Sequence, residues 1–196
     1  MTHHFEYSIG AVHMNNAKDS VEKMQQATPK EIGFSYDIEE FEIFSNNTRY
    51  GVLAIYSINA ALETIVALTS REFGISQTRF AARVDTLISQ GIITNLIAID
   101  NLKNLRKKRN FITHWEENPT ELLGTSSYLP IMFAETTPEN ETEDLISMLI
   151  PERINQYILN LTDLLDDIIC QIDKEINMKL YYSLQQIKEE RLVVGY

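Results

Sequence analysis

A basic segment near the middle of the chain ends in a histidine and the only tryptophan. It reads LRKKRNFITHW over residues 105–115. Arginine and histidine suit phosphoryl chemistry, because a guanidinium stabilises charge on phosphate oxygens and an imidazole transfers protons near neutral pH. Arg109 and His114 are the candidates for these roles, with Asn110 between them. The segment is therefore a solvated helix end, a nucleic-acid-binding surface or part of an active site.

The spacing of apolar residues places this segment on a helix that begins near Thr94 and closes at Asn118-Pro119. The core-facing side carries Leu96, Ile99, Leu102, Leu105, Ile112 and Trp115. Arg109 falls on or beside this apolar stripe. Burying a guanidinium is costly unless it is paired or faces a ligand, so Arg109 is expected to have a partner or a cleft.

Arg106, Asn110 and His114 lie four residues apart and form one row along the helix. Arg109 and His114 are five residues apart, hence roughly 140° apart around the helix axis. One helix cannot easily point both side chains at a single atom, whereas two copies related by a two-fold axis can combine them. We therefore expect a homodimer.

The stretch Arg109-Asn110-Phe111-Ile112-Thr113-His114 resembles the motif of the HEPN superfamily (higher eukaryotes and prokaryotes nucleotide-binding domains). That motif is an arginine, usually followed by a polar residue, with four to six residues separating it from a histidine. The surroundings are similar too: an apolar helix with an internal acid, Glu63, then a second helix, then LKNLRKKRNFITHW on a third. The resemblance covers roughly residues 48–118.

The resemblance implies a metal-independent endoribonuclease of a toxin–antitoxin or antiviral defence system. His114 would act as general base or acid near the 2′-hydroxyl or the leaving oxygen, and Arg109 would stabilise the phosphorane-like oxygens. Asn110 would orient the phosphate or His114. The implied RNA-binding residues are Arg106, Lys107, Lys108 and Glu63. The implied partners are RNA, a second copy and an antitoxin or other regulatory protein, without metal or cofactor.

Other interpretations stay open. The charges from Lys103 to Arg109 can form a solvated helix face, and Glu63 can be a polar residue on a crowded helix or simply an arginine partner. The main alternative function is a catalytically inactive HEPN-like module that binds a nucleotide or a protein, followed by a purely structural helical protein. Glu116 stands where some members of the superfamily carry a tyrosine that a partner modifies, so that route of control is not expected.

Composition limits the possible functions. The net charge of −11 and a pI near 4.8 argue against a general nucleic-acid coat, because such binding needs many cations. A local basic site remains possible, since screening limits distant charges to about 10 Å. The single cysteine, Cys170, excludes an intrachain disulfide. His3, His4 and His13 lack the spacing of metal ligands, so no metal site is expected.

The elements that must position the candidate site are helical, because only 7 glycines and 5 prolines interrupt 196 residues. We expect an all-α, HEPN-like bundle of four or five main helices over residues 48–196, preceded by an irregular N-terminal elaboration over residues 1–47. A short strand and a short helix before Thr28-Pro29 are expected within that elaboration.

The bundle is expected to begin with a helix capped by Asn47 or Thr48 that runs to about Glu72. A second helix spans Ser76 to Gly91, and the helix of the basic segment follows it. After a loop over residues 119–142, a last helix starts at Pro151 and can continue through Ile187. No signal peptide and no uninterrupted membrane span is expected, which favours a cytoplasmic protein without membrane contact.

Overall fold

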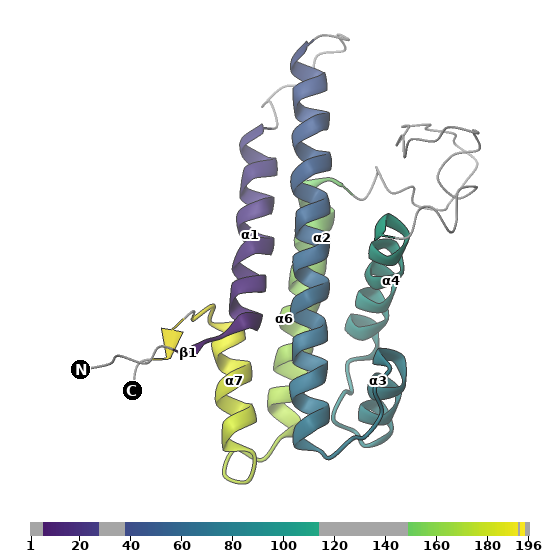
Figure 1. Cartoon of the computed structure of the whole chain (residues 1–196), viewed down its shortest axis with the longest axis vertical. Coiled ribbons are helices and arrows are strands. Elements are labelled where there is room, and N and C mark those ends of the chain that lie inside the picture. The colour runs from purple at the N-terminus through teal and green to yellow at the C-terminus, as the bar shows by residue number, and fades with distance from the viewer. Residues whose placement is uncertain (1–5, 28–37, 114–148, 192, 195–196) are drawn as a thin grey trace.

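The structure, a computed structural model, describes residues 6–27, 38–113, 149–191 and 193–194. Within these residues it is an all-α bundle, as the sequence predicts (Figure 1). Six helices are described: α1 (Ile9–Ala27), α2 (Ile38–Glu72), α3 (Phe80–Ser89), α4 (Leu96–Thr113), α6 (Pro151–Gln171) and α7 (Met178–Lys188). A two-residue strand β1 (Glu6–Tyr7) pairs antiparallel with β2 (Val193–Val194) and joins the two ends of the described chain.

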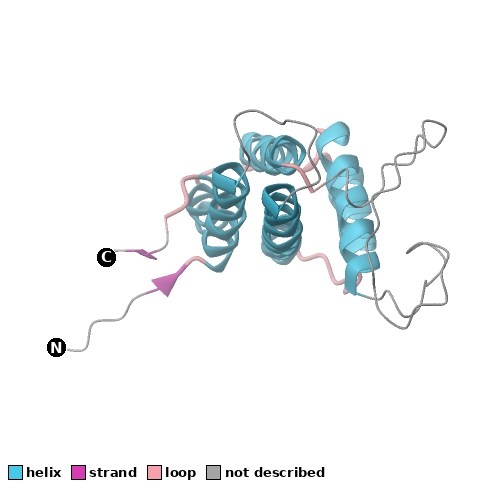
Figure 2. Ribbon diagram, turned by 90° about the horizontal axis from the view of Figure 1, so that it is seen from above, coloured by secondary structure: helices cyan, strands magenta, loops and turns pink. Residues whose placement is uncertain are grey.

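Helix α2 is the centre of the bundle. It packs against α1, α3, α4, α6 and α7, and Figures 1 and 2 show the other helices arranged around it. Its side chains are buried on more than one face, as Ala61 and Val66 illustrate, because five residues correspond to roughly 140° around the helix axis. Within the described residues, α2 is also the one helix long and apolar enough to cross a membrane by length and composition, over Asn46–Glu72. Half of its most apolar window is buried inside the bundle.

The short strand and the helix expected before Thr28-Pro29 are present as β1 and α1, but α1 is longer than expected and packs within the bundle. Met14, Ala17, Val21 and Met24 are buried at helical spacing and pack against α2. Gly10 permits the close packing of this helix on α7, because a Cβ there would lie 2.5 Å from Cδ1 of Ile187. The hydrophobic pattern of α1 was weak because small residues and methionines form its buried stripe among many polar residues.

The start of α2 was predicted wrongly. The helix begins at Ile38 and passes Asn47 and Thr48 without a break, so neither residue caps it and residue 48 is no element boundary. Gly51 lies inside the helix, where glycine costs about 1 kcal/mol relative to alanine. It is explained by packing, since a Cβ there would lie 2.8 Å from Cδ2 of Leu149.

The turns on either side of α3 follow the sequence more closely. Gly74 and Gly91 adopt φ values of 65° and 70°, a region that favours glycine, and end α2 and α3 as predicted. Helix α3 starts later than expected, with Arg79 rather than Ser76 at its N-cap. Both turns are short, so α2, α3 and α4 are fixed next to one another.

The C-terminal region forms two helices instead of one continuous helix. The backbone leaves α6 at Ile172, and Asp173 Oδ1 accepts hydrogen bonds from the backbone nitrogens of Glu175 (2.8 Å) and Ile176 (3.2 Å). This turn lets α7 pack beside α1, α2 and α6. The apolar stripe continues across the break, which is why periodicity alone did not reveal it.

Candidate functional site

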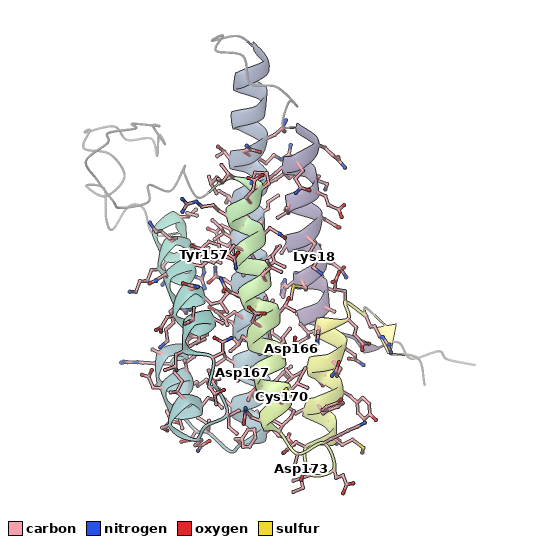
Figure 3. The ribbon with its side chains drawn as sticks, turned by 180° about the vertical axis from the view of Figure 1, so that it is seen from behind. Lys18, Tyr157, Asp166, Asp167, Cys170 and Asp173 are labelled. Carbon is pink, nitrogen blue, oxygen red and sulfur yellow. The ribbon has the colours of Figure 1, made fainter. Side chains whose placement is uncertain are left out.

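The candidate site lies between α2 and α4, and the N-terminus of α4 is fixed by α6. Asp167 on α6 (Figure 3) accepts hydrogen bonds from the backbone nitrogens of Thr94 (2.7 Å) and Asn95 (2.8 Å). Asn95 in turn caps the helix, because its Oδ1 accepts from the backbone nitrogen of Ala98 at 3.1 Å. An anionic carboxylate is also favourable at the positive end of a helix.

Further along α4, apolar side chains anchor the helix and leave its arginines at the α2 boundary. Leu102 and Leu105 are fully buried, whereas the side chains of Arg106 and Arg109 keep 28% and 20% of their exposure. The guanidiniums therefore sit at the edge of the core, where a charge needs a partner.

That partner is Glu63 on α2. Its Oε1 lies 2.7 Å from Nη2 of Arg109 and 3.2 Å from Nη2 of Arg106. The Arg106 guanidinium also lies over the ring of Phe80 on α3, 4.7 Å from the ring centroid, which is favourable cation–π geometry. Two guanidiniums against one carboxylate leave one positive charge in excess, so this cluster still attracts an anion.

A second contact joins the same two helices at the end of α4. The hydroxyl of Tyr56 lies 2.9 Å from Oγ1 of Thr113, and that Oγ1 also lies 2.9 Å from the backbone oxygen of Arg109, to which it donates. Tyr56 and Glu63 are seven residues apart, about two turns, so they occupy one face of α2. The last described residue of α4 is thereby fixed directly before His114.

The structure brings together Glu63, Arg106 and Arg109 among the predicted site residues. On α4, Asn110 and Lys108 are half-buried, whereas Lys107 is exposed. The predicted row of Arg106, Asn110 and His114 can be followed only to Asn110, because His114 and Trp115 lie outside the described residues. His3 and His4 also lie outside them.

Sequence reasoning missed Tyr56 and Thr113. The sequence contained a weak signal for Tyr56, because this residue lies about two turns before Glu63 on a largely apolar helix. Nothing in the sequence pairs Tyr56 with Thr113, because they are 57 residues apart and meet only through the packing of α4 on α2.

Among the described residues, no group of histidine, cysteine and acidic side chains is arranged to hold a metal ion. His13, the histidine that the structure describes, is half-buried on α1. The site residues that can be placed are thus cations, one carboxylate, an amide and two hydroxyls. Such a set can bind and orient a phosphate, and it needs a proton-transfer group to cleave one.

Comparisons of the chain with protein-family models, with curated proteins and with solved structures found no match.

Proposed function

We propose that the protein is a metal-independent endoribonuclease of the HEPN type, active as a homodimer. The observation that carries the proposal is the orientation of Arg109 by Glu63 at 2.7 Å, five residues before His114 in the sequence. An arginine held at the edge of the core, in a cluster with excess positive charge, is suited to bind a phosphate that changes charge during reaction.

The proposed reaction is a transesterification within RNA. His114 removes the proton of a ribose 2′-hydroxyl, and the 2′-oxygen attacks the adjacent phosphorus. The bond from phosphorus to the 5′-oxygen breaks, and this leaving oxygen takes up a proton from His114 or its counterpart in the second copy. The products are a 2′,3′-cyclic phosphate and a 5′-hydroxyl. Arg109 stabilises the negative charge on the phosphorane oxygens, and Asn110 orients the phosphate or His114.

The homodimer is proposed because five residues separate Arg109 from His114 in the sequence, a spacing that corresponds to roughly 140° around a helix axis. A second α4, related by two-fold symmetry, supplies the missing group to each phosphate. Arg106, Lys107 and Lys108 then guide the RNA backbone toward the cleft. The net charge of −11 limits general affinity for RNA, which favours a narrow range of substrates.

The biological role that goes with this activity is a toxin or defence effector. We propose a cytoplasmic location, and an antitoxin or other regulatory protein as the partner that controls the nuclease. The acidity of the chain suits a basic segment on such a partner.

One observation favours a second function, that of a catalytically inactive HEPN-like binding module. Glu63 contacts both Arg109 and Arg106 within one protomer, and a carboxylate at 2.7 Å occupies a guanidinium that a phosphate would otherwise bind. In an inactive module this ion pair would only join α2 to α4. The two functions differ in whether His114 matters for any activity.

Cleavage of RNA by the purified protein in the presence of EDTA tests the proposal. We expect wild-type protein to produce 2′,3′-cyclic phosphate ends. His114→Ala and Arg109→Gln should each reduce the rate by at least about a hundredfold, the usual range for removing acid–base or electrostatic catalysis. His13→Ala is the matched control and should cleave like wild type. Equal rates for His114→Ala and wild type, or no cleavage by the dimer, would favour the inactive module.

A further inference from the structure

One side of the central helix α2 is not covered by another described helix. Figures 1 and 2 show α6 behind α2, with α1 and α4 on either side of it, while the fourth side is open within the described residues. Leu53, Ala60 and Ala67 share this side, because they recur at intervals of seven residues, about two helical turns. Tyr56 and Thr64 lie between them. These five residues form what we call the outer face of α2.

The outer face is apolar for a surface that meets solvent. Leu53 and Tyr56 are exposed, and Ala60, Thr64 and Ala67 are half-buried. The five residues are spaced by three or four positions, which is the spacing by which one helix packs along another. The small side chains of the two alanines leave room for larger side chains of a neighbouring helix. A contiguous apolar strip of this kind indicates an interaction surface.

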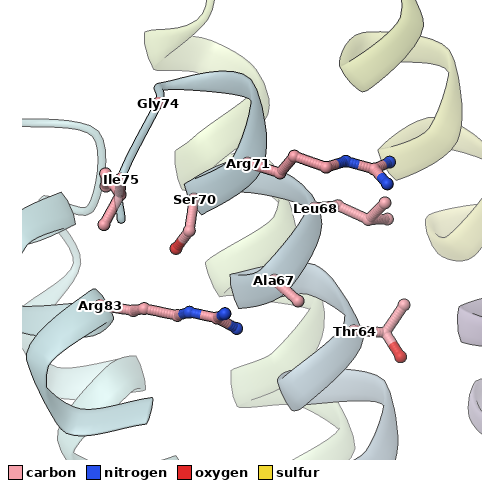
Figure 4. A pocket seen from close by; sticks show the side chains of 8 residues that line it. All are labelled: Thr64, Ala67, Leu68, Ser70, Arg71, Gly74, Ile75 and Arg83. Atoms are coloured by element: carbon pink, nitrogen blue, oxygen red, sulfur yellow. The ribbon is translucent and has the colours of Figure 1, made fainter. Parts of the chain in front are cut away.

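A cavity of about 530 Å³ hollows the outer face near the C-terminal end of α2 (Figure 4). Thr64, Ala67 and Leu68 line it from α2, and Ile75 lines it from the turn that follows the helix. Most of this lining is apolar. The cavity therefore has room for a large apolar side chain that projects from a helix lying along the outer face.

An arginine lies at each end of the outer face. Arg49 and Arg71 are 22 residues apart, about 33 Å along the helix, and neither has a carboxylate partner among the described residues. Lys23 on α1 adds positive charge near Arg49, because both cations lie 5.4 Å from the ring centroid of Tyr50. At the other end, Figure 4 shows Arg71 and Arg83 on opposite sides of α2, with Arg83 reaching it from α3.

The acidic residues of α2 do not neutralise these cations. Between Arg49 and Arg71 the only acid in the sequence is Glu63, and its carboxylate already contacts Arg106 and Arg109. The outer face thus combines an apolar centre with positive charge at both ends, on a chain whose net charge is −11. A partner that covers it must supply apolar side chains in the middle and negative charge at the ends.

A second copy of this chain does not meet that requirement. Antiparallel packing of two outer faces about Ala60 would put Arg49 of one copy opposite Arg71 of the other, and parallel packing would put each arginine opposite its own equivalent. Like charges in these positions oppose association. A helix with carboxylates near both ends and apolar side chains between them has the complementary pattern. The acidity of the whole chain favours basic partner segments elsewhere, but on the outer face the local charge is reversed.

We propose that the outer face of α2 binds an acidic amphipathic helix of a partner protein. The partner helix lies along α2 and packs apolar side chains, spaced by three or four residues, against Leu53 and Ala60. One of these side chains enters the cavity at Ala67. Carboxylates near the two ends of the partner helix pair with Arg49 and Arg71. The proposal does not rest on the ribonuclease function, because none of the residues proposed for cleavage belongs to the outer face.

Titration of the full chain with three synthetic helical peptides, followed by fluorescence anisotropy, tests the proposal. The first peptide has leucines spaced by three and four residues and glutamates near both ends, over roughly the 33 Å between the two arginines. The second carries lysines in place of the glutamates, and the third is a scrambled version of the first. We expect the glutamate peptide to bind at least about tenfold more tightly than either of the others, because both the charge and the apolar spacing must match.

Variants of the outer face locate the binding. Leu53→Glu should weaken the glutamate peptide by at least about tenfold, because it places a charge in the apolar contact. Leu159→Glu is the matched control, since Leu159 lies on α6 and is exposed to the same extent, 48%, as Leu53. It should bind within about twofold of wild type, a typical surface effect. Arg71→Glu should weaken the glutamate peptide about three- to tenfold and strengthen the lysine peptide, a reversal that loss of folding cannot produce.

Three results of the titrations would overturn the proposal: no binding of the glutamate peptide at about 100 μM, equal affinity for the glutamate and lysine peptides, or equal effects of Leu53→Glu and Leu159→Glu. Two further measurements test other occupants. Sedimentation should give the same mass for wild type and Leu53→Glu, and a dimer lost only in that variant would mean that a second copy covers the outer face. Phosphatidylserine vesicles should not displace the glutamate peptide, and displacement would mean that the face binds a lipid surface. His114→Ala should bind the peptide like wild type, so the outer face can be judged even if the ribonuclease proposal fails.

Discussion

Individual arginines in this protein have different environments, and the difference decides what each can do. Arg106 and Arg109 share one oxygen of Glu63, whereas Arg71 and Arg83 have no carboxylate partner in the described residues. The Glu63 side chain keeps 42% of its exposure, so solvent screens its ion pairs and they contribute little to stability. The main consequence of the pair is therefore geometric, since it fixes the direction of the Arg109 guanidinium.

Glu63→Gln tests this positioning role. The free energy of unfolding should fall by less than about 1 kcal/mol, as for an exposed ion pair. If Arg109 acts on the phosphate, kcat for RNA cleavage should fall about tenfold with KM little changed, because Arg109 loses its orientation and keeps its charge. Denaturant unfolding and steady-state kinetics measure the two effects. Glu152→Gln, at an exposed position on α6, is the control; an unchanged kcat for Glu63→Gln would show that Arg109 needs no positioning.

Part of this residue-scale geometry could be predicted from the sequence. Arg109 had to find a partner because it lies beside the buried stripe of its own helix, and Glu63 was one of the candidates. The contact between Tyr56 and Thr113 could not be predicted, because hydroxyl groups on two helices carry no pattern that reveals their relative register.

At the scale of elements, α4 carries most of the candidate site. Asp167 on α6 binds the backbone at the N-terminus of α4. Asp167 accepts from two backbone nitrogens at 2.7 and 2.8 Å, although it lies more than 70 residues away in the chain. The start of the helix near Thr94 could be predicted from local periodicity. Its anchoring to α6 could not, because the capping group comes from a distant segment.

Replacing this distant cap should loosen α4. Asp167→Asn keeps the size of the side chain and removes its negative charge, so we expect a loss of about 1–2 kcal/mol in the free energy of unfolding, the usual value of a capping interaction. Urea denaturation followed by circular dichroism measures it. Asp163→Asn on the same helix is exposed and should change stability by less than about 0.5 kcal/mol. Equal effects of the two variants would mean that the cap contributes nothing specific.

Helix ends were predicted well where glycine marks them and poorly where it does not. Gly74 and Gly91 end α2 and α3 because their backbone conformation favours a residue without Cβ. The start of α2 and the break between α6 and α7 have no such marker. The extent of α1 was underestimated although Met14, Ala17, Val21 and Met24 recur at helical spacing, because many polar residues lie between them.

Gly51 tests whether close packing explains a glycine inside α2. Gly51→Ala improves helix propensity but places a Cβ 2.8 Å from Leu149, so we expect a net loss of about 1–3 kcal/mol in the free energy of unfolding, as for overpacking of a core. Thermal or urea unfolding measures it. Leu149→Ala alone should also destabilise by leaving a cavity. In the double variant the two losses should be less than additive; strict additivity would contradict a direct contact between the two positions.

At the scale of the whole molecule, two groups on α6 and α7 couple the stability of the bundle to alkaline pH. Burial raises the pKa of Tyr157 above its ordinary value of 10.0, and nearby Arg153 lowers it by less. A hydrogen bond to Asp166 raises the pKa of Lys188 above its ordinary value of 10.5. Both groups hold their protons more tightly in the folded protein than in the unfolded chain.

The sign of the pH dependence follows from this difference. Below pH 10 both groups are protonated in both states, and their full contribution to stability is present. Above that pH the unfolded chain loses protons that the folded protein keeps, so the free energy of unfolding falls as pH rises through the folded pKa values. Asp166 and Lys188 are both partly exposed, so solvent screening reduces the contribution of this ion pair to the pH dependence of stability.

Tyr157→Phe and Lys188→Met should therefore flatten the alkaline loss of stability, because neither replacement titrates. The measurement is the free energy of unfolding in urea from pH 7 to pH 11. The difference between each variant and wild type at pH 7 reports lost packing or pairing, and the change of that difference above pH 10 reports titration alone. The wild type should become less stable more steeply than either variant. Parallel curves across the whole range would show that neither proton is held more tightly in the folded bundle.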